Sequence, residues 1–172
     1  MKLKIRGGIP LKGAINIPAD KSLTHRGLMF GALGNRSLTV KALGAGEDNH
    51  STAEVLRGLG VNIEAIEGGY IVHGVGLDGL QDADGPLDCG NSGTTIRLMC
   101  GILAGAGVSA SLVGDESLSK RPMSRVTVPL RKLGGKVQGV ESGGKERTPL
   151  EVAPSTLRGG DWMSPIASAQ VK

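Results

Sequence analysis

The sequence predicts an α/β (α+β) protein built from a repeated βαβαββ unit, with two units present and a third beginning. Strand-like and helix-like segments follow one another in the same order twice along the chain. One helix in each copy ends in nearly the same letters, Leu56–Gly60 and Leu130–Gly134, at an offset of 74 residues. Self-similarity at a fixed spacing is the signature of a repeat architecture. An apolar content of 39% is enough for a buried core.

The first unit shows each element by its hydrophobic period and its turn residues. A Gly68-Gly69 turn separates its last two strands. We expect a strand at Ala14–Pro18, a helix at Ser22–Leu33, a strand at Ser37–Ala42, a helix at Asn49–Leu59, and strands at Asn62–Ile66 and Tyr70–Gly74.

The second unit repeats this order after a glycine-rich turn. We expect a helix from Asn91-Ser92-Gly93 to Ala106, a strand at Ser109–Val113, a helix at Pro122–Leu133, and strands at Lys136–Val140 and Pro149–Val152. A third unit opens at Trp162–Pro165, with a helix near Ala167 that reaches only Lys172. An isolated helical turn gains little packing. We therefore expect a fragment of a larger protein, with a frayed tail as the alternative.

Composition and charge exclude several classes of function. The net charge of +4 is modest, and no basic run with interleaved aromatics indicates a nucleic-acid partner. No segment has the length of a signal-peptide core or a membrane span, so we expect no membrane partner and a cytoplasmic protein. Two cysteines form no disulfide framework and no metal-binding motif. Cys100 is expected in the core, and Cys89, beside the glycine-rich turn, is expected to be partly reactive.

Positive residues stand at three expected helix starts, where the helix dipole disfavours them. Lys21, His25 and Arg26 crowd the first helix, and Arg97 lies in the first turn of an otherwise uncharged apolar helix. Lys120-Arg121 precedes Pro122, a favourable first helical residue. A shared anionic ligand would relieve this repulsion and accept bonds from backbone N–H groups. Solvated surface charge explains any single one of these helix starts as well as a bound anion does. It explains the three helix starts together less well.

The segment Asp88–Thr95 is rich in small residues that allow close backbone approach and helix capping. It is not a P-loop, because no Gly-Lys-Ser/Thr follows at the required spacing. Taken alone, an ordinary capped turn explains it.

The acidic residues give weaker signals. Asp20 is expected to cap the first helix or to orient Lys21, while Glu47 and Asp48 have the positions of helix caps. Asp115 and Glu116 are expected to begin a loop. No pair of carboxylates is placed for general acid–base catalysis.

Four ordered motifs resemble the 5-enolpyruvylshikimate-3-phosphate synthase family and cover most of the chain. They are Pro18–Arg26, Leu87–Leu98, Gly114–Met123 and Pro165–Lys172. The resemblance implies the enolpyruvyl transferase fold: two similar domains, each of three βαβαββ units. Residues 1–172 would then form the N-terminal, shikimate 3-phosphate-binding domain, incomplete at its C-terminal end, with the second domain absent. In this family the N-terminal strand, here up to Pro18, associates with the other domain.

The implied reaction transfers the enolpyruvyl group of phosphoenolpyruvate to the 5-hydroxyl of shikimate 3-phosphate and releases phosphate. It belongs to the shikimate pathway, which leads to chorismate and the aromatic amino acids. It proceeds by addition and elimination through a tetrahedral intermediate, with no metal and no organic cofactor. The family's acid–base carboxylates come from the second domain, so the fragment alone is expected to be inactive.

The matching motifs imply a role for each site residue. Lys21 would contact both substrates and act in catalysis by neutralising charge in the transition state. Shikimate 3-phosphate would be bound by Lys21, Ser22, Arg26, Ser168, Ala169 and Gln170. Phosphoenolpyruvate would be bound by Lys21, Asn91, Gly93, Thr94, Arg121 and Gln170.

Two positions bear on how closely the chain follows the family. Ala19 stands where we expect glycine, so the turn before Asp20 is expected to shift, because Ala disfavours positive φ. Gly93 is retained, and glycine there is associated in this family with sensitivity to glyphosate. We therefore expect a glyphosate target.

Three alternatives stay open. The sister enzyme that transfers the same group to a UDP-sugar, UDP-N-acetylglucosamine enolpyruvyl transferase, shares the fold. It carries a Lys-Asn-Ala type opening in place of Lys21-Ser22, and a reactive cysteine in a mobile loop where this chain has Ser117–Arg121. A stand-alone anion-binding module would explain the cations but not the third repeat. The chain could also pair with a separately supplied second half.

Overall fold

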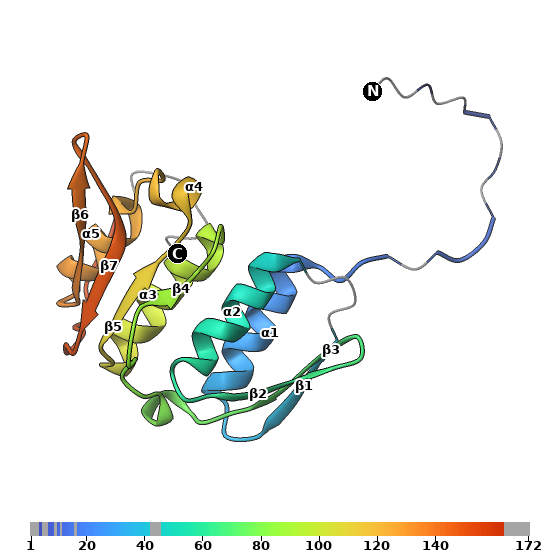
Figure 1. Ribbon diagram of the computed structural model, residues 1–172, viewed down its shortest axis with the longest axis horizontal. Helices are drawn as coiled ribbons and strands as arrows, with labels where there is room; N and C mark the ends of the chain where they lie inside the picture. The colour runs from blue at the N-terminus through green and yellow to red at the C-terminus, as the bar shows by residue number, and fades with distance from the viewer. Residues whose placement is uncertain are drawn as a thin grey trace.

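The computed structural model describes residues 4, 7–8, 10, 12–15, 17–41 and 46–163. Within these residues the strands form two sheets, one of three strands and one of four. Helices of the same unit pack against each sheet, as Figure 1 shows. The two predicted α/β units are therefore confirmed.

The first unit is an antiparallel sheet covered by two helices. Its sheet has the strand order β1-β3-β2, and α1 contacts β1 and β3 while α2 contacts β2. The elements are α1 (Lys21–Leu33), β1 (Ser37–Lys41), α2 (Glu47–Arg57), β2 (Asn62–Ile66) and β3 (Gly69–His73). All five elements match predicted ones within a few residues.

The second unit repeats this arrangement and adds one strand. Its sheet has the order β4-β5-β7-β6, in which β4 pairs with β5 in parallel and the other pairs are antiparallel. The elements are the 3₁₀ helix η1 (Leu77–Gly79), β4 (Leu87–Asp88), α3 (Gly93–Ala106), β5 (Ala110–Val113), α4 (Glu116–Ser119), α5 (Ser124–Lys132), β6 (Lys136–Ser142) and β7 (Lys145–Ala153). The order β5-β7-β6 thus corresponds to β1-β3-β2.

The strand predicted at Ala14–Pro18 is wrong for its described residues, which form no strand. The corresponding segment of the second unit is held by backbone bonds that continue past β4, from Cys89 N to Val113 O and from Asp115 N to Gly90 O, both 2.9 Å. Such bonds satisfy a strand's polar groups. Described residues 14, 15, 17 and 18 are instead exposed, with Ile15 at 85%.

Two further expectations about local structure were wrong. Residues 116–119 form the short helix α4 rather than a loop, because Asp115 caps it and its carboxylate accepts a 2.7 Å bond from Leu118 N. The next helix begins at Ser124 rather than at Pro122. The strands β6 and β7 are also longer than predicted, because Gly143 and Gly144, with φ of 60° and 69°, make a tight turn between them.

The helices connect the two units through one core. Helix α2 contacts α1 on one side and α3 on the other, and α3 contacts α5. Leu28, Leu56 and Met99, one from each of these first three helices, are completely buried in a single apolar cluster. This packing places the N-terminal ends of α1, α2 and α3 together. No helix in the described part of the chain is long and apolar enough to cross a bilayer.

Candidate anion-binding site

The first side of the site is the start of α1. Asp20 caps this helix, and its carboxylate accepts a 2.7 Å bond from Leu23 N. This confirms the capping role expected of Asp20. The ammonium of Lys21, the first residue of α1, lies 2.6 Å from Asp48 Oδ2 on α2. Ser22 and Arg26 are both exposed and stand four residues apart, so they lie on the same side of the helix.

Asp48 has a different role from the one predicted. Glu47 and Asp48 are not caps of α2, since they lie inside its first turn and the cap is Gly46, which has no side chain to bond. An acidic first turn is favoured by the helix dipole. The Asp48 carboxylate is therefore available to hold Lys21, whose side chain remains 56% exposed.

His25 is a buried neutral residue rather than one of the cations at the helix start. It is 1% exposed, and its Nδ1 lies 2.7 Å from Thr52 Oγ1. Burial lowers the pKa of His25, and the nearby Asp48 carboxylate opposes that shift only in part. The neutral imidazole is therefore favoured. The ring belongs to the support of the site and not to its positive charge.

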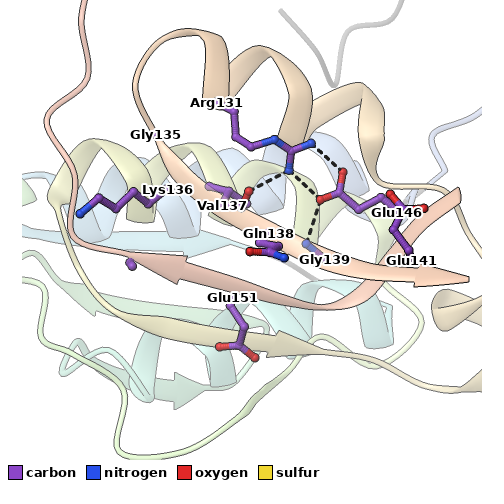
Figure 2. Close-up of a pocket in the computed structure, with 10 residues that line it drawn as sticks. Arg131, Gly135, Lys136, Val137, Gln138, Gly139, Glu141, Glu146 and Glu151 are labelled. Carbon is purple, nitrogen blue, oxygen red and sulfur yellow. Dashed lines mark hydrogen bonds and ion pairs between the residues drawn. The ribbon is translucent and has the colours of Figure 1, made fainter.

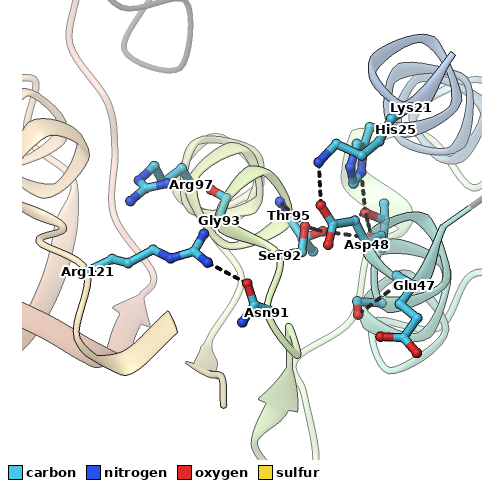
Figure 3. A network of polar contacts seen from close by, with 12 residues as sticks. Lys21, His25, Glu47, Asp48, Asn91, Ser92, Gly93, Thr95, Arg97 and Arg121 are labelled. Carbon is cyan, nitrogen blue, oxygen red and sulfur yellow. Dashed lines mark hydrogen bonds and ion pairs between the residues drawn. The ribbon is translucent and has the colours of Figure 1, made fainter. Parts of the chain in front are cut away.

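Buried hydroxyl groups connect α1, α2 and α3 beneath these residues (Figure 3). Thr52 Oγ1 lies 2.7 Å from Thr95 Oγ1, and Thr95 Oγ1 donates to Ser92 Oγ at 2.7 Å. Both threonine hydroxyls also lie 3.3 Å from the main-chain oxygen of Asp48. A continuous run of short polar contacts thus joins His25 on α1 to the N-cap of α3.

The second side of the site is the start of α3. Ser92 caps this helix by accepting a 3.1 Å bond from Thr95 N. Gly93 is the first helical residue, and a Cβ added there would lie 2.5 Å from Arg97 Nη1 and 3.1 Å from Arg121 Nη1. Arg97 is 8% exposed and donates its Nη1 to Gly93 O at 3.0 Å. Two guanidinium groups therefore lie close to a glycine with no side chain.

Asn91 holds Arg121 in place from the turn before α3. Its side-chain oxygen accepts from Arg121 Nη2, and its nitrogen donates to Asp115 Oδ2 at 2.8 Å. The backbone N–H of Leu118 and the Asn91 amide lower the pKa of Asp115, so this carboxylate stays ionised. The relay Asp115–Asn91–Arg121 orients the guanidinium toward Gly93.

Positive charge accumulates at this second side. Burial lowers the pKa of Arg97, and the positive charges of Arg125 and Arg121 lower it further. Like charges that destabilise one another are stabilised by a bound anion. The start of α3 has no acidic residue in its first turn, and its helix dipole favours negative charge. The arrangement is suited to binding a phosphate or carboxylate.

The structure brings together most of the residues singled out in the sequence. Lys21, with exposed Ser22 and Arg26, lies on the α1 side, while Asn91, Gly93, Thr94 and Arg121 lie on the α3 side. Ser168, Ala169 and Gln170 lie outside the described residues. Sequence reasoning missed Asp48, Thr52 and Thr95 as members of the site. The available signal was a hydroxyl residue, Thr52, next to the apolar residues Ala53, Val55 and Leu56 on the buried face of α2.

One other expectation is corrected near the site. Cys89 is not reactive, because it is fully buried, and burial together with Asp88 raises its pKa to about 12. Ala19 has no positive φ, like every non-glycine residue in the described part, and the expected shift of this turn stays a prediction. Within the same residues, no group of three or more His, Cys, Asp and Glu side chains is arranged to hold a metal ion.

A separate hollow of about 750 Å³ lies along the edge strand β6 (Figure 2). Its lining includes Arg131, Lys136, Glu146 and Glu151, and it shares no residue with the two helix starts. Arg131 and Glu146 bond to each other there, at 2.7 Å between Nη1 and Oε1. Its charges are of both signs, so it lacks the one-signed field that an anion site needs.

Comparisons with known proteins give the same assignment over nearly the whole chain. The family model for EPSP synthase (3-phosphoshikimate 1-carboxyvinyltransferase) matches residues 5–172. The 3-phosphoshikimate 1-carboxyvinyltransferase of Bacillus subtilis (strain 168) is 51% identical over 162 residues, which cover 94% of this chain and 37% of that protein. The protein of the same name from Synechococcus sp. (strain RCC307) is 49% identical over 171 residues, covering 98% of this chain and 39% of that protein.

A solved structure agrees with the sequence relatives. The EPSP synthase of Acinetobacter baumannii superimposes with a TM-score of 0.86 at 40% identity, covering 93% of this chain and 36% of that one. The chain therefore spans less than two fifths of the length of these relatives. By family model, sequence and fold, this chain belongs to the EPSP synthase family.

Proposed function

We propose that the chain forms the shikimate 3-phosphate-binding part of an enzyme that transfers the enolpyruvyl group of phosphoenolpyruvate to shikimate 3-phosphate. The observation that carries the proposal is the pair of cationic helix starts, Lys21 with Arg26 and Arg97 with Arg121, joined by one buried polar run. Two anionic substrates that must react with each other need two adjacent anion sites, and cationic starts on two helices linked in this way support that reading.

We assign the roles by the matching motifs, and the positions of the described residues support them. Arg26 and Ser22 bind shikimate 3-phosphate from the exposed side of α1. Asn91, Gly93, Thr94 and Arg121 bind phosphoenolpyruvate at the start of α3, where the helix dipole assists. Lys21 contacts both substrates and stabilises the charge that develops during transfer. Ser168, Ala169 and Gln170 complete the shikimate 3-phosphate contacts.

The reaction consists of an addition and an elimination. The 5-hydroxyl oxygen bonds to the carbon of phosphoenolpyruvate that carries the phosphate, a proton adds to the neighbouring methylene carbon, and the hydroxyl proton is lost. Removal of a proton from the resulting methyl group then expels phosphate. By the family resemblance, the acid and base for these steps belong to the second domain.

A chimera tests this proposal. In the Bacillus subtilis relative, the stretch that matches this chain is replaced by the chain itself, and phosphate release from phosphoenolpyruvate is measured. Release that requires shikimate 3-phosphate, and that Lys21→Ala abolishes, is the expected result. Release that depends on a UDP-sugar would favour the sister reaction. A folded chimera that binds phosphate but has no turnover would overturn the proposal in favour of a binding module.

A further inference from the structure

The hydroxyl of Thr52 occupies the point where α1, α2 and α3 meet. It lies 2.7 Å from His25 Nδ1, 2.7 Å from Thr95 Oγ1 and 3.3 Å from Asp48 O. Thr52 is completely buried on α2, between Val55 and Leu56 further along that helix and the start of α3. A buried hydroxyl is retained at a core position when its partners require it.

The hydrogens along this run can be assigned by counting. Each hydroxyl donates one hydrogen. His25 donates from either Nδ1 or Nε2, depending on its tautomer. The Nε2–H tautomer places that hydrogen on an atom that is buried with no partner in the described structure. A buried N–H without an acceptor is the costlier choice, so Nδ1–H donates to Thr52. The single hydrogen of Thr52 is then left for its two acceptors, Asp48 O and Thr95 Oγ1.

This run is connected to Lys21 through Asp48. The main-chain oxygen of Asp48 lies 3.3 Å from both Thr52 Oγ1 and Thr95 Oγ1, while its carboxylate holds the Lys21 ammonium at 2.6 Å. Lys21 has a long flexible stem, and a lysine ammonium is otherwise positioned only loosely. The position of the Asp48 backbone therefore determines where the ammonium lies relative to both anion sites.

We propose that Thr52 is a positioning residue for Lys21: its hydroxyl fixes α2 against α1 and α3, and Asp48 transmits that position to the Lys21 ammonium. This inference rests on the proposed function for its effect on ligand binding. Its structural part, the link between Thr52 and the Lys21–Asp48 pair, can be tested without a ligand. Thr52 is completely buried, so it affects a ligand only through its neighbours, and we assign that effect to Asp48.

The binding test is a double-mutant cycle on the affinity of the chain for shikimate 3-phosphate. Thr52→Val removes the hydroxyl at nearly constant shape, and we expect it to weaken binding about tenfold. In an Asp48→Asn background, Thr52→Val should weaken binding by less than about twofold, because Asp48→Asn has already broken the ion pair with Lys21. Thr52→Ser should restore binding. Ser51→Ala, which removes a hydroxyl that donates to Glu47 O of its own helix, is the matched control and should have no effect.

The ligand-free test follows the NMR signals of the Lys21 side chain, assigned with Lys21→Arg. Thr52→Val should move them toward their positions in Asp48→Asn, and Thr52→Ser should return them. Should Thr52→Val fail to fold, Thr95→Val should move them in the same direction by a smaller amount.

The outcomes separate the two claims. Equal effects of Thr52→Val in both backgrounds, or unmoved Lys21 signals in folded Thr52→Val, would overturn the positioning role. A wild-type chain that does not bind shikimate 3-phosphate would count against the proposed function, and the Lys21 signals would then decide the positioning role alone.

Discussion

The two units place their cations at the same helix end in different ways. In α1 the first residue is Lys21, which is exposed, and the fifth is His25, which is buried and neutral. In α3 the first residue is Gly93 and the fifth is Arg97, which is buried and reaches back to the Gly93 carbonyl. In α3, therefore, the cation comes from Arg97 at the fifth position, whereas in α1 it comes from Lys21 at the first. Both reach the same end of the helix, because helical residues four apart are neighbours. The glycine provides the space for Arg97.

Helices α2 and α5, which correspond to each other in the two units, both carry an arginine in their last turn, but the two arginines have different partners. Arg57 donates to Ile63 O at 3.0 Å, and Arg131, 74 residues later, donates to Val137 O at 2.8 Å. Arg57 pairs with the exposed Glu54 on its own helix. Arg131 pairs with Glu146, which is 6% exposed. One interaction is therefore a surface ion pair and the other is part of a buried network.

The largest expected effect is that of Arg131→Met, which tests whether the buried ion pair stabilises the fold more than the surface pair does. Burial opposes ionisation of Glu146, but bonds from Arg131, Thr127 and Gly139 outweigh it and lower its pKa. Arg131→Met leaves that carboxylate buried without its cation and should cost about 3 kcal/mol in the free energy of unfolding. Arg57→Met should cost about 1 kcal/mol. Urea denaturation measures both, and equal costs would mean that the two networks are equivalent.

A smaller effect tests the space at Gly93. Ala there would displace the guanidinium groups of Arg97 and Arg121, so we expect Gly93→Ala in the chimera to weaken inhibition by glyphosate about tenfold. Gly105→Ala is the matched control, because it lies in the same helix with nothing within 4 Å of an added Cβ. An unchanged inhibition constant in Gly93→Ala would contradict the role of this glycine.

The pH dependence of stability tests the buried fifth residue of α1. Burial lowers the pKa of His25 below its ordinary value of 6.5, so the unfolded chain binds a proton more readily than the folded one. Stability from this residue is therefore present above pH 6.5 and is lost as the pH falls through the lowered pKa. Thermal unfolding between pH 7 and pH 5 should show this loss, and His25→Met should remove it. His50→Gln, at an exposed histidine, should leave it intact.

The smallest expected effect is that of Ile17→Ala, which tests the difference between the two units at the first strand, with Leu87→Ala as its counterpart in the second unit. Leu87 of β4 is 7% exposed, and Leu87→Ala should cost about 3 kcal/mol. Ile17 is 76% exposed and belongs to no strand, so Ile17→Ala should change the free energy of unfolding by less than about 0.5 kcal/mol. A large cost at Ile17 would show that the first unit has a packed strand after all.

Local patterns predict the repeated elements well, because hydrophobic period and turn residues act over short distances. The offset between Leu56–Gly60 and Leu130–Gly134 is enough by itself to indicate two units. The strand at Ala14–Pro18 failed because strand formation requires a partner, which a short-range pattern does not supply. The Gly143-Gly144 turn is a local signal of the same kind as Gly68-Gly69, and it could have given the full lengths of β6 and β7.

Charge alone indicated only the conspicuous cations of the site, whereas Ser22, Asn91, Gly93 and Thr94 were assigned by the family resemblance and stay predictions. Lys21 and Arg121 stand out as cations at helix starts, whereas the role of Asp48 depends on α2 packing beside α1, a contact across 27 residues. His25 was expected to be a cation because burial, which changes its charge state, depends on tertiary structure. Thr52 and Thr95 connect helices that are far apart in sequence, so their link could not be predicted from either segment alone.

The most direct test of the central claim is calorimetric titration of this chain with shikimate 3-phosphate, for the wild type, Arg26→Ala and Arg36→Ala. Arg26 is exposed in the second turn of α1, and Arg36 is exposed beyond the C-terminal end of that helix, so the two changes remove the same charge at different positions along one segment. We expect saturable binding by the wild type and Arg36→Ala, and binding weakened at least tenfold in Arg26→Ala. Equal affinity for all three proteins, or none for the wild type, would contradict an anion site at the start of α1.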